Sequence, residues 1–149
     1  MTLRVPSADP CPFCAYLAGD AECAFVTRTE SVASFVNLRQ YERGALLVIP
    51  VRHLPTVLDV DADMLGAVHW EAVRLGRALI RAFDASGLNI FQNNGISAGQ
   101  TVPHYHVHVV PRYARSDPRR RFQEGSFEAV AFSERLEIAE SIRTALGAI

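Results

Sequence analysis

The sequence predicts an α+β domain in which helices pack on a mostly antiparallel β-sheet. Several short stretches are rich in β-branched and aromatic residues, which are typical of strands. The connections between the first of these stretches are short, which favours antiparallel neighbours because parallel strands need long crossovers. A long amphipathic segment follows them, and a second one closes the chain.

Five segments are predicted as strands. Two short ones flank a polar turn, the third is continuously apolar, the fourth follows the long helix, and the fifth carries a row of histidines. In chain order they are Ala24–Thr27, Val32–Asn37, Ala45–Val51, Leu88–Gln92 and His104–Val109. Pro103 and Pro111 fit the entry and the exit of the last strand.

Two segments are predicted as helices. Asp61–Phe83 has an apolar stripe at three- and four-residue spacing, Asp61 or Asp63 as N-cap, and Ser86-Gly87 beyond its end. The stripe contains Met64, Leu65, Val68, Ala72, Leu75, Leu79 and Phe83. Ser133–Leu146 is predicted to start with Ser133 as its cap and to bury Leu136, Ala139, Ile142 and Leu146. His69 on the long helix is interpreted as a surface or packing residue.

Length and composition limit the function. The chain has 149 residues, 49% of them hydrophobic, so we expect one domain (1–149) with a loose leader at 1–9. The formal net charge of −1 does not indicate nucleic acid or membrane as a partner. There is no apolar signal segment, no run near the ~20 residues of a membrane span, and only three cysteines. These features predict a cytoplasmic protein from a reducing compartment.

The central motif is the alternation of His104, His106 and His108 in the fifth strand. Alternate residues of a strand share a face, so the three imidazoles should project together while the residues between them face the core. Imidazoles bind metals, and a neutral imidazole nitrogen can also attack phosphorus as a nucleophile. Spacing alone does not separate a metal site from covalent catalysis.

The loop before this strand favours phosphate chemistry. Gly95, Gly99, Gln100 and Thr101 can bring backbone amides and a hydroxyl close to an anion, and Asn93 adds an amide donor. After the strand, the basic run Arg115, Arg119, Arg120 and Arg121 is interpreted as a solvated loop rather than a polyphosphate contact.

Cys11-Pro12-Phe13-Cys14 is a Cys-x-x-Cys pair without the βαβ setting of a redox motif. Such a pair supplies half of a zinc site, and His53 and His104 are the natural donors for the other half. The alternative is a small apolar turn with free thiols. Cys23 is interpreted as a core residue.

These motifs resemble those of the histidine triad (HIT) superfamily. The family pattern of three histidines alternating with apolar residues is matched in full by residues 104–110, and the match extends over about 10–115. It includes Asn93-Asn94-Gly95, Ala98-Gly99-Gln100-Thr101, and Pro111-Arg112. The Pro-Arg ending resembles the fragile histidine triad, or dinucleoside polyphosphate hydrolase, branch. Residues 116–149 are then a C-terminal loop and helix.

The resemblance implies a subunit with about five strands, a homodimer, and roles for particular residues. His106 matches the nucleophile, and His108, Gln100 and Asn93 match groups that assist it. Asn37, Gly99 and Thr101 match nucleotide contacts, and so does Phe35, for which core packing is an equally good interpretation. Several bacterial HIT proteins and the related galactose-1-phosphate uridylyltransferases bind structural zinc at positions matching Cys11, Cys14, His53 and His104. Many members have Gly-His where this chain has Gly44-Ala45.

The implied function is cleavage at the α-phosphate of a nucleoside 5′-phosphate derivative through a nucleotidyl-histidine intermediate. Dinucleoside polyphosphates, phosphoramidates and adenylate esters are candidate substrates, the first as magnesium complexes, and no catalytic metal is needed. Two alternatives are a nucleotide-binding regulator with incidental hydrolase activity and a metalloenzyme that uses the three histidines as an open zinc site.

Overall fold

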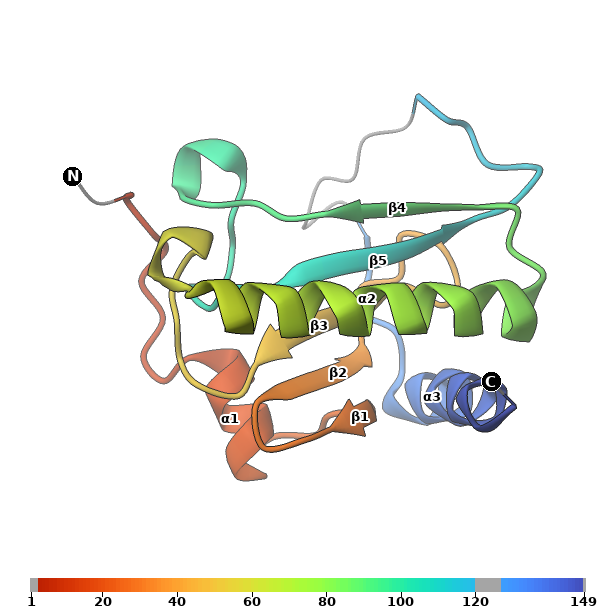
Figure 1. The fold of residues 1–149 in the computed structure, drawn as a ribbon, viewed down its shortest axis with the longest axis horizontal. Coiled ribbons are helices and arrows are strands. Elements are labelled where there is room, and N and C mark those ends of the chain that lie inside the picture. Colours follow the sequence, from red (N-terminus) through yellow and green to blue (C-terminus); the bar gives the residue numbers. More distant parts are fainter. Residues whose placement is uncertain (1–2, 120–126, 149) are drawn as a thin grey trace.

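The computed structural model describes residues 3–119 and 127–148, and it confirms the α+β prediction (Figure 1). Five strands form one sheet: β1 (Phe25–Arg28), β2 (Val32–Val36), β3 (Leu46–Pro50), β4 (Gly87–Phe91) and β5 (Val107–Arg112). The α-helices are α1 (Pro12–Ala18), α2 (Ala62–Phe83) and α3 (Phe132–Gly147), and two short 3-10 helices are η1 (Val57–Asp59) and η2 (Ile96–Ala98).

The strand order is β1-β2-β3-β5-β4, and every pairing is antiparallel. β2, β3 and β5 are buried along their whole length, which explains the continuous apolar run of the third predicted strand. In the middle of the sheet Leu47 pairs with His108, and His108 pairs with Phe91 on the other side. The histidine strand therefore lies between two neighbours rather than at an edge.

One face of the sheet is covered by α2, which runs across it in Figure 1, and by α3. Asp61 caps α2 by accepting a 2.8 Å hydrogen bond from the Met64 N–H, as the sequence predicted. Gly76 brings α2 close to β4, because a Cβ at this position would lie 2.7 Å from Leu88 Cδ1. Tyr105, Val107 and Val109 join this core, which confirms their predicted orientation.

The other face carries a smaller apolar cluster under α1. Phe35, Leu47 and Ile49 of the sheet pack there with Cys11 and Phe13. No helix was predicted after Cys11, so α1 was missed. A signal was present, since Pro12 is at the first helical position and Gly19 ends the helix in a left-handed conformation with φ of 83°.

The predicted strand from His104 to Val109 is correct only from Val107, and β5 continues through Pro111 to Arg112. Before Val107 the chain makes other bonds: the Tyr105 N–H donates to the Leu54 carbonyl, and the His104 N–H donates to the Val102 carbonyl. Pro111 is tolerated inside β5 because β3 pairs only with residues 107–109, so β4 alone lies beside it.

Two predictions for α3 are wrong. The helix begins at Phe132 with Ala131 as N-cap, so Ser133 lies inside it. Leu136 is 42% exposed, whereas Ile138 and Ala145 are buried, because the face toward the sheet is rotated from the predicted stripe. Ala139 and Ile142 are buried as predicted.

Described residues of the predicted leader and of the basic run make specific contacts. The Arg4 carbonyl accepts a 2.8 Å hydrogen bond from the Ile96 N–H, so residues near Arg4 are held against the loop at η2. Arg115 lies over the Tyr113 ring, and Arg119 contacts Asp117, whereas Arg120 and Arg121 lie outside the described residues. In the described part of the chain, none of the helices has the length and apolar character needed to cross a membrane.

Candidate active site and metal centre

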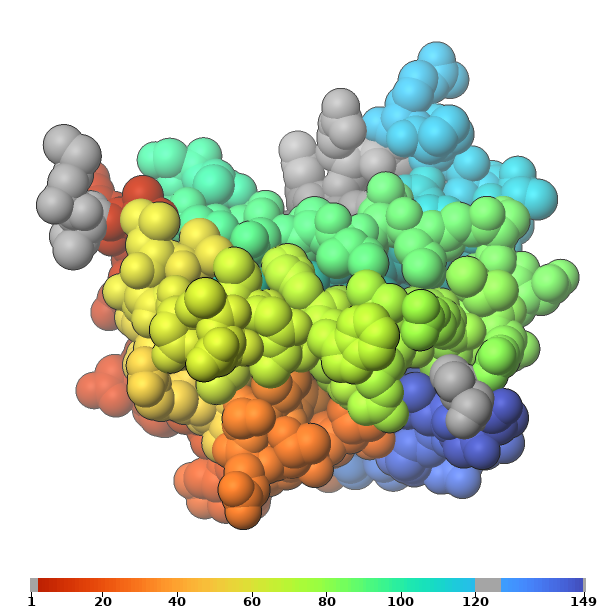
Figure 2. Space-filling model, in the orientation of Figure 1, coloured from red at the N-terminus to blue at the C-terminus, as the bar shows by residue number. Residues whose placement is uncertain are grey.

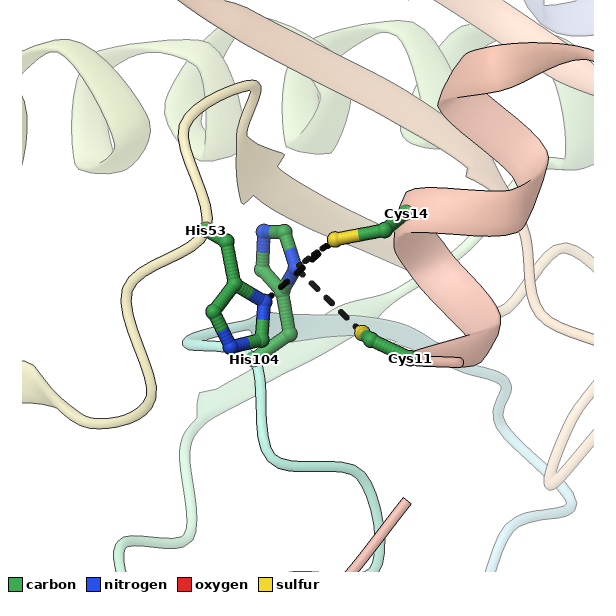
Figure 3. A group of neighbouring side chains, drawn as sticks. All are labelled: Cys11, Cys14, His53 and His104. Atoms are coloured by element: carbon green, nitrogen blue, oxygen red, sulfur yellow. Dashed lines mark hydrogen bonds between the residues drawn. The ribbon is translucent and has the colours of Figure 1, made fainter. Parts of the chain in front are cut away.

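Cys11, Cys14, His53 and His104 come together as the sequence predicted, and their donor atoms all lie within 4.8 Å of one another (Figure 3). Cys11 is the N-cap of α1, Cys14 lies in its first turn, His53 follows β3, and His104 precedes β5. The His104 Nε2–H donates to the Pro50 carbonyl at 2.8 Å, so the lone pair is on Nδ1, which lies 3.7 Å from both sulfurs.

The electrostatics of this group fit a cation. Burial raises the pKa of Cys14 to about 11, with the hydrogen bond and the charge of Cys11 adding to the effect. Burial lowers the pKa of His104 to about 4, so this imidazole is neutral near pH 7. Two adjacent thiolates therefore need a neighbouring cation to stay deprotonated. Two sulfurs and two imidazole nitrogens are a donor set that Zn²⁺ accepts in tetrahedral geometry.

His106 is held in one tautomer by its neighbour in the chain. Its Nδ1 lies 2.6 Å from the His104 carbonyl oxygen, and a carbonyl can only accept, so Nδ1 carries the proton. The lone pair is then on Nε2, so in this tautomer Nε2 is the nitrogen with the chemistry of a base or a nucleophile. The side chain is 2% exposed and packs edge-on against the Phe13 ring at 5.2 Å.

His108 is surrounded by aromatic rings that the sequence analysis did not assign to the site. It stacks on Phe91 with ring centroids 4.4 Å apart and an interplanar angle of 2°, and Tyr41 lies 5.9 Å away. The His106 and His108 rings are 5.0 Å apart. Phe91 could have been found from the sequence, because it lies in the predicted fourth strand, which pairs with the histidine strand. Tyr41 could not, because it comes from a loop.

A cavity of about 370 Å³ lies next to aromatic rings that contact these imidazoles, and neither His106 nor His108 is among the described residues that line it. Its wall includes Phe13, which contacts His106, and Tyr41, which contacts His108. Two of the predicted nucleotide contacts, Asn37 and Thr101, also line it. The remaining lining residues are Pro12, Tyr16, Leu38, Arg39, Leu47 and Val102. The volume is within the range of small-molecule pockets, which are mostly apolar with a few polar groups.

Phe35 and Gly99 do not line the cavity. Phe35 is 2% exposed and packs behind the wall, 5.3 Å from the Phe13 ring and 5.5 Å from the Tyr16 ring. Gly99 is exposed in the loop after η2 with φ of 85°, a conformation that favours glycine. A Cβ at Gly99 would lie 3.9 Å from Asn93 Nδ2, so these two predicted site residues are neighbours.

The Gln100 side chain is used within the loop. It is 4% exposed, its Nε2 donates to the carbonyls of Pro55 at 2.7 Å and Val102 at 2.9 Å, and its Oε1 accepts from the Gly95 N–H at 2.7 Å. Both amide hydrogens are therefore occupied, and a direct contact with phosphate oxygens would break one of these bonds. In this conformation Gln100 holds the loop rather than facing the cavity.

Gln40 holds the loop on the opposite wall of the cavity. Its Nε2 donates to the carbonyls of Asn37 and Ala45 at 2.8 and 2.9 Å, and its Oε1 accepts from the N–H groups of Gly44 and Ala45. These bonds fix the segment that carries Asn37 and Tyr41. Ala45, the position where many HIT proteins have histidine, is buried against Tyr41 and Val110.

Comparison with known proteins agrees with these motifs. The family model for the HIT domain matches residues 18–115. "Protein hit" from Bacillus subtilis is 40% identical over 111 residues, which cover 74% of this chain and 76% of that protein. The asymmetrical bis(5′-nucleosyl)-tetraphosphatase of Schizosaccharomyces pombe is 40% identical over 85 residues, or 57% of this chain, and the match spans only about half (47%) of that enzyme.

Among solved structures, a Zn-bound histidine triad family protein from Mycobacterium smegmatis superposes with a TM-score of 0.79 at 30% identity. The superposition covers 95% of this chain and 96% of that one. The histidine alternation, the fold and the family match over most of the chain lead to one conclusion: the chain belongs to the HIT domain family.

Proposed function

We propose that this protein is a nucleotide hydrolase or nucleotidyl transferase that acts at the α-phosphate of nucleoside 5′-phosphate derivatives through a nucleotidyl-histidine intermediate. The observation that carries the proposal is the tautomer of His106, whose Nδ1–H donates to the His104 carbonyl and leaves the Nε2 lone pair for attack. The similarity to a bis(5′-nucleosyl)-tetraphosphatase supports the reaction class.

The reaction has two displacement steps at phosphorus. Nε2 of His106 attacks the α-phosphorus, the bond from phosphorus to the leaving oxygen or nitrogen breaks, and the leaving group gains a proton. Water then attacks the same phosphorus, the P–N bond breaks, and the nucleoside monophosphate leaves while His106 regains its lone pair. His108, 5.0 Å from His106, would hydrogen-bond the phosphate and move protons in both steps.

Residues of the two loops would bind the rest of the substrate. Asn93 and Thr101 would stabilise the phosphate oxygens, together with backbone amides near Gly99. Asn37 would bind the ribose, and the base would lie against the apolar wall that Phe35 supports. Gln100 is proposed as a positioning residue for the phosphate loop, because its amide already bonds to Gly95, Pro55 and Val102.

We propose that Cys11, Cys14, His53 and His104 hold a structural Zn²⁺, because the four donors converge and a zinc-bound relative has the same fold. Four protein ligands leave no open position, so the ion would stabilise the fold and take no direct part in the reaction. Magnesium would arrive only with polyphosphate substrates. The alternative of an open three-histidine zinc site is disfavoured, because His104 is the only triad member in this group among the described residues.

The experiment is intact-mass analysis of quenched turnover. Mixing the protein with diadenosine tetraphosphate or adenosine phosphoramidate and quenching in neutral denaturant should give an added adenylate located on His106. His106→Ala should abolish product formation and keep the zinc content, while His69→Ala, a matched change on α2, should keep both. Normal turnover in His106→Ala would refute the nucleophile. Nucleotide binding without turnover in the wild type would favour the regulatory alternative.

We also propose that two copies associate through α2 and the edge strand β4. Trp70, Val73 and Ile80 are exposed on α2, which crosses the middle of the face seen in Figure 2, and Ile90 is exposed on β4. An exposed apolar surface next to the outermost strand of a sheet favours self-association. Trp70→Asp should yield monomers in sedimentation velocity. Leu58→Asp is the control: it also replaces an exposed apolar residue by aspartate, but it lies on η1, outside the proposed interface, and should leave the dimer intact. Equal sedimentation of wild type and Trp70→Asp would refute this interface.

A further inference from the structure

Helix α1 takes part in both the metal centre and the cavity. Cys11 and Cys14 place their sulfurs toward His104, as Figure 3 shows. Pro12, Phe13 and Tyr16 of the same short segment line the cavity. Two binding sites therefore share one seven-residue helix as a common wall.

The position of α1 depends on these contacts. A helix of this length is far below the ~12–15 residues that an isolated helix needs for marginal stability in water, so tertiary contacts must hold it. The thiol–imidazole group holds its N-terminus, and the bond from Arg28 Nη2 to the Leu17 carbonyl holds its C-terminus. Phe13 and Tyr16 pack on Phe35 between these two points.

Phe13 is the residue that joins the two sites. Its ring lies 5.8 Å from the His104 ring, which belongs to the metal group, and 5.2 Å from the His106 ring at an interplanar angle of 89°. It is only 6% exposed, yet it forms part of the cavity wall. A shift of the Cys11–Cys14 segment would therefore displace a ring that contacts the imidazole of His106 and would contact a ligand in the cavity.

We infer that Phe13 is a positioning residue that couples the metal centre to the cavity, so that Zn²⁺ and nucleotide bind with positive cooperativity. The inference rests on the proposed function, since it takes a nucleoside monophosphate as the occupant of the cavity. A metal that fixes the two sulfurs fixes α1 in the position seen here. A nucleotide that packs on Phe13 prefers this same position, and each ligand then favours the binding of the other.

Thermodynamic linkage gives the inference a quantitative form. If AMP tightens Zn²⁺ binding by some factor, Zn²⁺ must tighten AMP binding by the same factor. Couplings between distinct sites are typically about 5- to 150-fold, which is the range we expect here. A Phe13 that only filled space would change stability and leave this factor unchanged.

The test measures that factor in the full-length protein. Zinc affinity is determined by competition with a chromophoric chelator, without and with saturating AMP, and AMP affinity is determined by calorimetry on the zinc-loaded and zinc-free protein. The wild type should give a factor of at least about five from both directions. Phe13→Leu should bring it close to one, with zinc affinity in the absence of AMP nearly unchanged because both cysteines remain.

Phe25→Leu is the matched control. Phe25 contacts Phe35 in the same ring cluster at 6.1 Å but does not line the cavity, so this variant should keep the wild-type factor. If Phe13→Leu fails to fold by circular dichroism, Phe13→Met replaces it.

The outcomes separate the inference from the proposed function. AMP binding to the wild type with a factor near one refutes the coupling and leaves the proposed function standing. A factor that survives in Phe13→Leu refutes the role of Phe13. No AMP binding by the zinc-loaded wild type refutes the nucleotide site, and the coupling with it.

Discussion

Replacing Gln100 by alanine tests whether this residue holds the phosphate loop or touches the substrate. The change removes three short hydrogen bonds and leaves the buried Gly95 N–H and the half-buried carbonyls of Pro55 and Val102 without these partners. An unsatisfied buried group costs about 1–3 kcal/mol, and partly solvated carbonyls cost less, so the free energy of unfolding should fall by about 2–4 kcal/mol. Turnover should fall as well, because the same loop carries Asn93 and Thr101.

Urea unfolding of zinc-saturated protein, followed by far-UV circular dichroism, measures this cost. With a denaturant slope of about 2 kcal/mol/M, the midpoint should move by about 1–2 M. Gln92→Ala is the matched control, since within the described residues the Gln92 Oε1 has no hydrogen-bond partner to lose. If the free energy of unfolding of Gln100→Ala stays within about 0.5 kcal/mol of the wild-type value while turnover is lost, the amide acts on the substrate directly. The assignment of Gln100 as a residue that holds the loop would then be wrong.

Three further predictions concern the metal centre, the helix-side core and the third cysteine. His104→Ala and Cys11→Ser should lower zinc stoichiometry and thermal stability together, because loss of a ligand removes binding free energy that stabilises the fold. Metal analysis and calorimetry measure the two quantities, and unchanged zinc content in these variants would exclude the site. Glu71→Ala should lower the free energy of unfolding by about 1–3 kcal/mol and leave kcat unchanged, because Glu71 bonds Thr27 and Arg74 on the face of the sheet opposite the imidazoles; a loss of kcat in folded protein would contradict this separation. Burial raises the pKa of Cys23 to about 12 from its usual 9.0. Its thiolate fraction at pH 8, and therefore its rate of alkylation, should be roughly 1,000-fold below those of an ordinary thiol. Mass spectrometry measures this rate, and rapid alkylation in folded protein would refute the effect of burial.

The periodic spacing of apolar residues in the sequence predicted most of the fold. The stripe from Met64 to Phe83 predicted α2 to within a residue, because a long amphipathic helix leaves a periodic signal in the sequence. The alternation around His106 likewise predicted which side chains of the histidine segment face the core. In α3 the same method chose the wrong stripe, since Leu136 and Ile138 both fit a helical period and only the packing against α2 and the sheet decides between them.

The site was predictable where the chemistry is carried by motifs. The four metal-binding candidates could be assembled from a Cys-x-x-Cys pair, two histidines and the family resemblance, and they do converge. The role of Gln100 could not be read in this way, because it depends on the Pro55 carbonyl, 45 residues away in the sequence. The aromatic contacts of His108 depend on Tyr41 and Phe91, which come from a loop and from a neighbouring strand.

One face of the sheet carries the larger apolar core, and the other face carries the candidate catalytic residues. Tyr105, Val107 and Val109 face α2 and α3, where the larger apolar core lies. On the other face, the described residues that cover His106 and His108 belong to α1, to aromatic rings and to loops fixed through Gln40 and Gln100. Because the period of a strand is two, one short segment supplies both faces, and a one-residue slip of β5 would move the imidazoles into the core. The pairing of β5 with β3 and β4 on both sides prevents such a slip, which explains why the catalytic candidates come from the middle of the sheet rather than from its edge.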